Sequence, residues 1–375
     1  MPRLFISAGE ASGDLHASHL IAELRKLDSA VEVTFLGGDL MARAAGTEPL
    51  IHYRDMAFMG FSEVLRNIHR LGRNLATARR AITARRPDAV ILVDYPGFNL
   101  RLARHAAAIG IPVFYYIPPK VWAWKEYRVK QLKKYSKAIF CLLPFEPEFY
   151  GRHGFDAAIY AGNPSLEEVD RRLSTLPTRD QFIADHNLTG RPILALVPGS
   201  RIGEIRNNLP VMTAVAARHP DLQAVVAGAP GIDIALYRRY TTLPIVDNAT
   251  FDLMAHSVAA LVTSGTASLE AALIGTPQVV LYRANGSRLS YNLFKRILKI
   301  DHVSLPNLIA GHEIVPEMLL HHCNPDDVDA ALTPLLNPAS PALRAQLDGY
   351  RQMRERLGTG SMAATAAAAI LNSLS

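Results

Sequence analysis

Short apolar runs alternate with stretches of helical periodicity along most of this chain, and this alternation constrains the fold more than any other feature. In the first half, the apolar runs predict strands at residues 3–7, 31–36, 49–52, 89–93, 113–117 and 138–142. Helical spacing of apolar residues appears at 15–27, 40–45, 62–84, 100–109, 126–134 and 146–153. Continuous apolar strands are typical of parallel sheets covered on both faces, so we expect a doubly wound α/β domain.

A second series of the same kind follows a turn at Ala161-Gly162-Asn163-Pro164 and a polar stretch, residues 165–177, which we interpret as a linker. Its predicted strands are 193–197, 222–227, 245–246, 259–263 and 278–282. From about residue 325 the chain is helical, without a strand signal. We predict a Rossmann-like domain at 1–165, a second at 166–345, and C-terminal helices at 346–375 that pack back on the first domain or on a partner chain.

Bulk composition narrows the class of protein. A chain of 375 residues suits two domains, and its net charge of +6 is too mild to imply a nucleic-acid partner. Two distant cysteines, Cys141 and Cys323, argue against a disulfide scaffold and a cysteine-rich zinc site. With neither a signal peptide nor an apolar stretch of about 20 residues, we expect a cytoplasmic protein without a membrane span.

One strand of the second series runs directly into a Gly-Ser-Arg turn. Gly199, Ser200 and Arg201 offer backbone N–H groups, a hydroxyl and a guanidinium at a helix N-terminus, with Glu204 in the first turn. This combination predicts a diphosphate site. The alternative is a capping serine beside a surface arginine.

A second strand-to-helix loop begins at Thr263 and carries further polar groups. Four of its residues could approach or donate to a phosphate, namely Ser264, Gly265, Thr266 and Ser268. Glu270 could accept hydrogen bonds from ribose hydroxyls, although the same residues would also cap the helix. Farther along, Asn307 beside a proline could contact a base or sugar edge.

The first half has candidate acids after two of its strands. The turn Ser7–Asp14 lacks the G-x-G-x-x-G pattern of a dinucleotide site. Its carboxylates, Glu10 and Asp14, would repel a phosphate, so they could instead meet sugar hydroxyls or a proton. The alternative is an ordinary strand–helix turn capped by Ser12 or Asp14. Asp94 ends strand 89–93 and is a candidate general base, or else a turn residue before a proline.

Two apolar stretches are candidates for lipid contact. Met59 and Phe61 lie in the first and Trp122 and Trp124 in the second, which leads into a basic segment, residues 120–137, holding seven Lys or Arg against one acid. Tryptophan and lysine together suit the surface of an anionic membrane. The alternatives are a core loop, and a buried tryptophan pair beside a solvated lysine helix.

The ordered set of motifs resembles the lipid-A-disaccharide synthase family of inverting GT-B glycosyltransferases. The segments that carry the resemblance span residues 7 to about 325 and are Ser7-Ala8-Gly9-Glu10-Ala11-Ser12-Gly13-Asp14, Met59-Gly60-Phe61-Ser62-Glu63-Val64-Leu65, Val93-Asp94-Tyr95-Pro96-Gly97-Phe98-Asn99, Val121-Trp122-Ala123-Trp124, Leu143-Pro144-Phe145-Glu146, Pro198-Gly199-Ser200-Arg201, Ser264-Gly265-Thr266-Ala267-Ser268-Leu269-Glu270 and Val303-Ser304-Leu305-Pro306-Asn307-Leu308. The chain departs from the family pattern at Asn163, Gly97 and Lys120, which affects sugar and acyl recognition rather than the reaction.

The resemblance implies two Rossmann-like domains facing across a cleft and transfer of 2,3-diacylglucosamine from UDP to 2,3-diacylglucosamine 1-phosphate. It implies neither a redox cofactor nor a tightly held metal. Ser200 and Arg201 would stabilise the leaving diphosphate, Glu270 would hold the ribose, and Asn307 would help to fix the nucleotide. Asp94 would be the base, with Glu10 as the second candidate. The acceptor and its acyl chains would be contacted by Ser12, Gly13, Met59, Phe61, Trp122 and Trp124.

Acylated substrates further imply peripheral association with an anionic inner-membrane surface, and a homodimer is left open. Three alternatives remain at this stage. The chain could be another GT-B protein, such as a UDP-N-acetylglucosamine 2-epimerase or a glucosaminyltransferase. It could be a two-domain binding protein without catalysis, or an NAD enzyme, which the missing glycine fingerprint disfavours.

Overall fold

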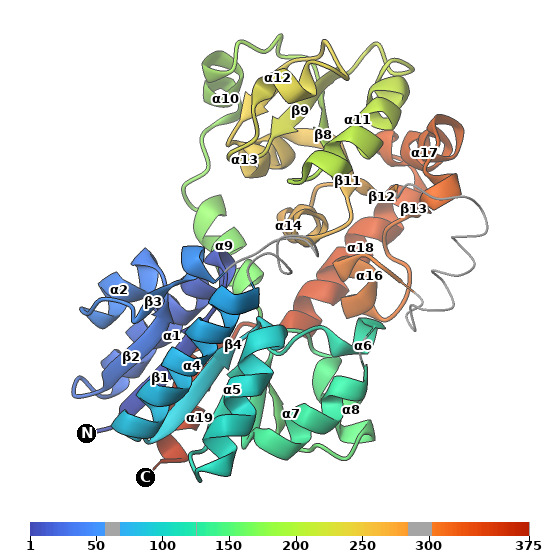
Figure 1. Ribbon diagram of the computed structural model, residues 1–375. Coiled ribbons are helices and arrows are strands. Elements are labelled where there is room, and N and C mark those ends of the chain that lie inside the picture. Colours follow the sequence, from blue (N-terminus) through green and yellow to red (C-terminus); the bar gives the residue numbers. More distant parts are fainter. Residues whose placement is uncertain (57–67, 125, 284–301, 375) are drawn as a thin grey trace. The chain divides into compact units, whose positions relative to one another are not determined.

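The computed structural model describes residues 1–56, 68–124, 126–283 and 302–374, and it divides into two compact units (Figure 1). Unit 1 comprises Met1–Pro164 and Thr359–Ser375, and unit 2 comprises Ser165–Gly358. Each contains a parallel sheet with helices packed against it, as the alternating pattern predicts. Within the described residues, no helix combines the length and apolarity needed to cross a membrane.

The described strands of unit 1 form a seven-stranded sheet in the order β3-β2-β1-β4-β5-β6-β7, and every pairing is parallel. Their bounds are β1 (Arg3–Ala8), β2 (Glu32–Gly37), β3 (Ile51–His52), β4 (Ala89–Val93), β5 (Val113–Tyr116), β6 (Ala138–Cys141) and β7 (Ala158–Tyr160). The strand order reverses between β1 and β4, which pair up to Ala8 opposite Val93. Loops that leave such a switch point diverge and open a crevice for a ligand.

Both faces of this sheet are buried, because side chains alternate between two apolar cores. In β1, Leu4 and Ile6 enter one core and Phe5 enters the other. The bounds of the unit 1 helices are α1 (Ala11–Leu27), α2 (Asp39–Ala45), η1 (Tyr53–Asp55), α4 (Ile68–Arg85), α5 (Pro96–Ala108), α6 (Val121–Trp124), η2 (Glu126–Arg128), α7 (Val129–Tyr135), α8 (Glu146–Arg152) and α19 (Met362–Asn372). The continuous apolar strands are therefore a consequence of two-sided burial.

Unit 2 repeats this architecture with a six-stranded sheet in the order β10-β9-β8-β11-β12-β13. Its strands are β8 (Ile193–Val197), β9 (Gln223–Gly228), β10 (Ile245–Asp247), β11 (Ser257–Thr263), β12 (Gln278–Tyr282) and β13 (Glu317–Leu319). Its helices are α9 (Pro164–Leu173), α10 (Arg179–Asp185), α11 (Ile202–Ala216), α12 (Ile234–Tyr237), α13 (Thr250–Ala255), α14 (Thr266–Ile274), α16 (Leu305–Ala310), η3 (Leu320–His322), α17 (Pro325–Leu332), η4 (Thr333–Leu336) and α18 (Pro341–Leu357). Here the switch point lies between β8 and β11.

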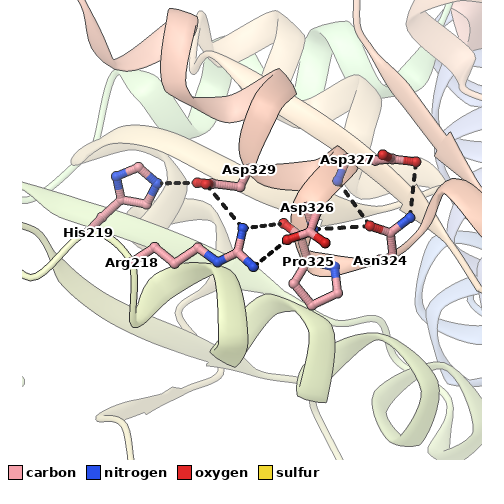
Figure 2. A network of polar contacts seen from close by, with 7 residues as sticks. All are labelled: Arg218, His219, Asn324, Pro325, Asp326, Asp327 and Asp329. Carbon is pink, nitrogen blue, oxygen red and sulfur yellow. Dashed lines mark hydrogen bonds and ion pairs between the residues drawn. The ribbon is translucent and has the colours of Figure 1, made fainter.

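A polar network joins the residues after α11 to the first two turns of α17 (Figure 2). Arg218 pairs with Asp326 and Asp329 at 2.6 and 3.3 Å, and His219 Nε2 lies 2.7 Å from Asp329 Oδ1. Asn324 caps α17 by accepting hydrogen bonds from two backbone N–H groups. Asp326 lies in the first turn of α17, where a carboxylate interacts favourably with the helix dipole. The ion pairs of Arg218 and the contact of His219 hold α17 beside α11.

Several predicted elements differ from the observed ones. The edge strands β7 and β13 were not predicted, because each has three residues and is only partly buried. The predicted linker 165–177 is largely helix α9, whose buried residues are Leu166 and Val169. Two buried positions in a charged segment are too few to show as a helical pattern in the sequence.

The C-terminal helices divide between the units. The boundary expected after residue 345 falls inside α18, which continues to Leu357 in unit 2 and packs against α14 and α16. Helix α19 instead packs on α1 of unit 1, one of the two alternatives left open above. Its buried side chains include Met362, Ala366 and Ile370, and the alanines allow the two helices to approach closely.

Asp14 supplies a test of how unit 1 is held together. It is buried, and its carboxylate accepts hydrogen bonds from the N–H groups of Gly38, Leu40 and Met41 at 2.7, 3.1 and 3.2 Å. We expect Asp14→Ala to lower the free energy of unfolding by about 2–3 kcal/mol, because buried donors lose their acceptor. Urea unfolding followed by tryptophan fluorescence measures this, since both tryptophans lie in unit 1. Glu48 is exposed, so we expect Glu48→Ala to change the free energy of unfolding by under about 0.5 kcal/mol. An equal loss in the two variants would contradict the stabilising role of Asp14.

Candidate functional site

A cavity of about 520 Å³ lies in unit 2 at the carboxyl ends of β8, β9 and β11, beside the switch point. It brings together most of the predicted donor-binding residues, which are Gly199, Ser200, Arg201, Glu204, Ser264, Gly265, Thr266 and Glu270. Its walls also include Arg172 and Phe251. The size and the mixture of apolar and polar groups suit a small organic anion.

The loop after β8 presents backbone N–H groups at the start of α11. Gly199 has φ +108°, a left-handed conformation that favours glycine. The N–H groups of Ser200 and Arg201 donate to Glu204 Oε2 at 3.1 and 3.3 Å. The Arg201 side chain is 80% exposed, and its Nη1 lies 3.4 Å from Glu204 Oε1. The loop can therefore stabilise negative charge, and a carboxylate of this chain already uses its amides.

Some residues of the loop after β11 are exposed, and others face the protein interior. Gly265 and Thr266 are exposed on the cavity, where they could contact a phosphate. Ser268 is buried and donates to Gly265 O at 2.7 Å, so its hydroxyl closes the turn. Ser264 Oγ donates to Val303 O at 3.2 Å. Ser268 thus supports the capping alternative, whereas Thr266 remains available to a ligand.

Glu270 lies on α14 at the edge of the cavity. Burial raises the pKa of its carboxyl group, with Arg172 opposing the rise and Glu168 adding to it. The Arg172 guanidinium stacks on the Phe251 ring at 4.2 Å from its centroid. A flat surface of this kind can receive a planar base. Sequence reasoning missed both residues, because Arg172 lies in the segment interpreted as a linker and Phe251 has no motif around it.

Asn307 differs from its predicted role. Its side chain is fully buried, and its Nδ2 donates to Val315 O and Glu317 Oε1 at 2.9 and 2.8 Å. Its Oδ1 accepts from the N–H groups of Ile314 and Val315 at 2.7 and 2.9 Å. The amide is therefore fully engaged in holding the 314–317 segment against α16. Its geometry gives a structural role in place of a direct base or sugar contact.

In unit 1, Asp94 and Tyr95 form a strained turn after β4, with φ +41° and +45°. Consecutive left-handed residues other than glycine are costly and persist only where neighbours hold them. Asp94 O accepts from Asn99 Nδ2 and from the Tyr115 hydroxyl at 2.9 and 2.6 Å, and Asp94 N donates to Ile117 O at 3.1 Å. These contacts fix the backbone and leave the Asp94 side chain with an exposed edge.

The Asp94 carboxyl group has the electrostatics of a base that works near neutrality. Partial burial is the largest cause that raises its pKa to about 6. The nearby Glu10 carboxylate adds to the rise, whereas Lys120 and the Tyr95 N–H oppose it. A raised pKa makes the ionised form a better proton acceptor, so this geometry and this environment fit the predicted role.

The loop after β1 lies beside this turn, because Ala8 pairs with Val93. Glu10 is exposed and stands at the N-cap of α1 without a side-chain capping bond. Ser12 is exposed in the first turn, whereas Gly13 packs against Ala8 and Val93, where a Cβ would lie 3.3 Å from the Ala8 side chain. Glu10 and Ser12 are thus open to a ligand. Gly13 serves close helix–sheet packing, and its predicted acceptor contact is not supported.

Trp122 is buried, which agrees with the alternative of buried tryptophans beside a solvated lysine helix. Its Nε1 donates to Glu146 Oε1 at 3.0 Å, and its ring packs edge-on against Phe145. Glu146 Oε2 accepts from the N–H groups of Leu142 and Leu143, and burial raises the Glu146 pKa to about 7. Trp122 therefore anchors α6 rather than presenting an indole to lipid. Met59, Phe61 and the Trp124 side chain lie outside the described residues.

Among the described residues, no cluster of three or more His, Cys, Asp or Glu side chains could hold a metal ion. The groups suited to a diphosphate are the loop amides, Thr266 and Arg201. Backbone dipoles and a guanidinium of this kind can stabilise negative charge on an anion.

Comparison with known proteins connects this geometry to one family. A family model described as lipid-A-disaccharide synthetase matches residues 4–370. A lipid-A-disaccharide synthase from Myxococcus xanthus is 40% identical, with 100% of this chain and 98% of the relative covered. The synthase of the same name from Nitrosococcus oceani is 36% identical, with 96% and 93% covered.

Solved structures support the fold alone, because their sequence identity is low. A UDP-GlcNAc 2-epimerase from Neisseria meningitidis bound to UDP-GlcNAc has a TM-score of 0.63 at 15% identity, with 99% of both chains covered. The calicheamicin glycosyltransferase CalG4 has a TM-score of 0.58 at 16% identity, with 100% of this chain and 98% of the other covered. The predicted pair of Rossmann-like, parallel-sheet domains is confirmed.

The buried Trp122 gives a test that separates anchoring from lipid contact. We expect Trp122→Phe to lower the free energy of unfolding by about 1–3 kcal/mol, since the Glu146 carboxylate loses a donor in a buried site. Urea unfolding followed by circular dichroism measures the change, with Tyr127→Phe at a 64% exposed ring as the matched control. Unchanged stability together with weaker binding to lipid vesicles would favour the membrane role instead.

Proposed function

Because the chain belongs to the lipid-A-disaccharide synthase family, we propose that it transfers 2,3-diacylglucosamine from its UDP donor to the 6-hydroxyl of 2,3-diacylglucosamine 1-phosphate. The products are UDP and a β-1′,6-linked disaccharide 1-phosphate. The observation that carries this proposal is the family match over residues 4–370. The epimerase alternative is not favoured, because that likeness is at 15% identity and reflects the fold.

In this proposal unit 2 binds the UDP moiety in its 520 Å³ cavity. The amides after β8, Arg201 and Thr266 stabilise the charge that grows on the leaving diphosphate. A guanidinium and a helix N-terminus supply such stabilisation without a metal. Glu270 accepts hydrogen bonds from the ribose hydroxyls, and the Arg172–Phe251 surface receives the uracil ring.

Unit 1 acts on the acceptor. Asp94 takes the proton from the attacking 6-hydroxyl, which makes the oxygen a stronger nucleophile as it bonds to the anomeric carbon. The C1–diphosphate bond breaks on the opposite face, so the anomeric configuration inverts. Glu10 orients the acceptor and, through its negative charge, keeps the pKa of Asp94 raised. Glu10 remains the second candidate for the base.

Acylated substrates require contact with a bilayer, and unit 1 offers a basic helix for it. Lys130, Lys133 and Lys134 are exposed on α7, which is anchored by buried Val129 and Leu132. The Tyr127 ring, 64% exposed, precedes this helix. An aromatic ring beside lysines suits an anionic lipid surface, so we assign peripheral docking at the inner membrane to α7. The homodimer stays a prediction.

A product assay with the diacyl donor and acceptor tests the reaction and the base together. Mass spectrometry should detect the tetraacyl disaccharide 1-phosphate with equimolar UDP, and Asp94→Asn should lower kcat by about 10²–10⁴. Because the base must be ionised, kcat/KM should fall as pH drops through about 6, the pKa of Asp94. The pH limb should disappear in Asp94→Asn.

Glu10→Gln is the comparison variant for this assignment. It removes a charge that raises the pKa of Asp94, so the acid limb should move to lower pH while catalysis persists. Near-normal kcat in Asp94→Asn with no turnover in Glu10→Gln would reverse the two roles. Epimerised UDP-sugar as the product would overturn the proposed reaction itself.

Flotation with vesicles containing anionic lipid tests the docking helix. Reversing Lys130, Lys133 and Lys134 to Glu should lower vesicle binding by more than tenfold, since each basic residue near an anionic surface contributes about 1 kcal/mol. The control reverses Arg179, Arg239 and Arg344, three exposed arginines of unit 2, with the same change in net charge. Equal losses in both variants, or a loss in neither, would refute docking through α7.

A further inference from the structure

The Glu204 carboxylate sits on the groups that a diphosphate would need. Its Oε2 accepts the N–H groups of Ser200 and Arg201 at 3.1 and 3.3 Å, and its Oε1 lies 3.4 Å from Arg201 Nη1. Glu204 also lines the 520 Å³ cavity. One side chain of this protein therefore engages two backbone donors and the guanidinium that face the proposed donor site.

We propose that Glu204 competes with the nucleoside diphosphate for these donors. Its carboxylate leaves the loop when UDP-sugar binds and returns when UDP departs. This inference rests on the proposed donor site. A diphosphate and a carboxylate cannot accept the same N–H groups from the same side, and their like charges repel. The carboxylate thereby lowers the affinity for the diphosphate and favours release of the product.

The surroundings allow the side chain to move while the helix stays fixed. Asn208 is buried one turn farther along α11, where its Nδ2 donates to Thr263 Oγ1 at 2.9 Å and its Oδ1 accepts from Arg283 N at 3.2 Å. Ile205 beside Glu204 is also fully buried. Glu204 itself is only partly buried at the cavity wall, so a rotamer change suffices to release the loop.

Gly199 lies directly against the Glu204 side chain. A Cβ at residue 199 would collide with the Glu204 side chain, and φ +108° already disfavours any other residue there. Ordinary helix capping by a residue at the third helical position explains the same hydrogen bonds without competition. The two explanations differ in the effect of charge, because a glutamine can cap but does not repel a phosphate.

Measuring the binding of UDP and of uridine to Glu204→Gln distinguishes competition with the diphosphate from helix capping alone. Isothermal titration calorimetry should show UDP binding on the order of tenfold more tightly than to the wild type, because the carboxylate's charge is gone. Uridine has no phosphate to displace Glu204, so its affinity should stay the same. In steady-state assays, UDP should become a correspondingly stronger product inhibitor.

Glu355→Gln provides a matched control, since it removes the same charge from an exposed position on α18 outside the cavity lining. It should leave UDP affinity unchanged. Unchanged or weaker UDP binding in Glu204→Gln, with normal melting temperature and uridine affinity, would overturn the competitor role while leaving the donor site intact. Absence of UDP binding to the wild type would overturn the donor site as well.

Discussion

Two-sided burial of parallel strands is the constraint on which both units depend. Each interior strand satisfies its backbone groups through its two neighbours and directs alternate side chains into two apolar cores, as β1 does with Leu4, Phe5 and Ile6. Polar chemistry is thereby excluded from the sheets and confined to loops at the strand ends. In both units, the loops that carry candidate chemistry leave the strands that flank the point of reversed order.

Many polar side chains of the sequence motifs are engaged by the fold itself. Asp14 holds the start of α2, Glu146 holds Trp122, and Asn307 holds the 314–317 segment. A buried polar group needs its partners, so these side chains have little capacity left for a ligand. The groups that stay accessible, such as Asp94, Thr266 and Arg201, are those with which a substrate can react or bond.

The two units differ in the charge that they present. In unit 1, a strained turn holds an acid whose pKa is raised by burial and by Glu10, which suits removal of a proton. In unit 2, amides and a guanidinium face a cavity, which suits the departure of an anion. In the proposed reaction, nucleophile activation and leaving-group stabilisation fall to separate sheets built on the same strand order.

The sequence by itself determined the fold class and indicated the strand-end loops that carry the candidate site. Alternating apolar periods predict both sheets because burial on two faces leaves a direct mark on composition, and the Gly-Ser-Arg turn and Asp94 follow strands that are easily recognised. Only the tertiary structure decided which side chains remain available. Trp122, Ser268 and Asn307 are internal, and Arg172 and Phe251 reach the cavity from segments without a motif. The physical reason is that availability depends on partners distant in sequence, such as Glu146 for Trp122 and Val315 for Asn307, and no local pattern encodes them.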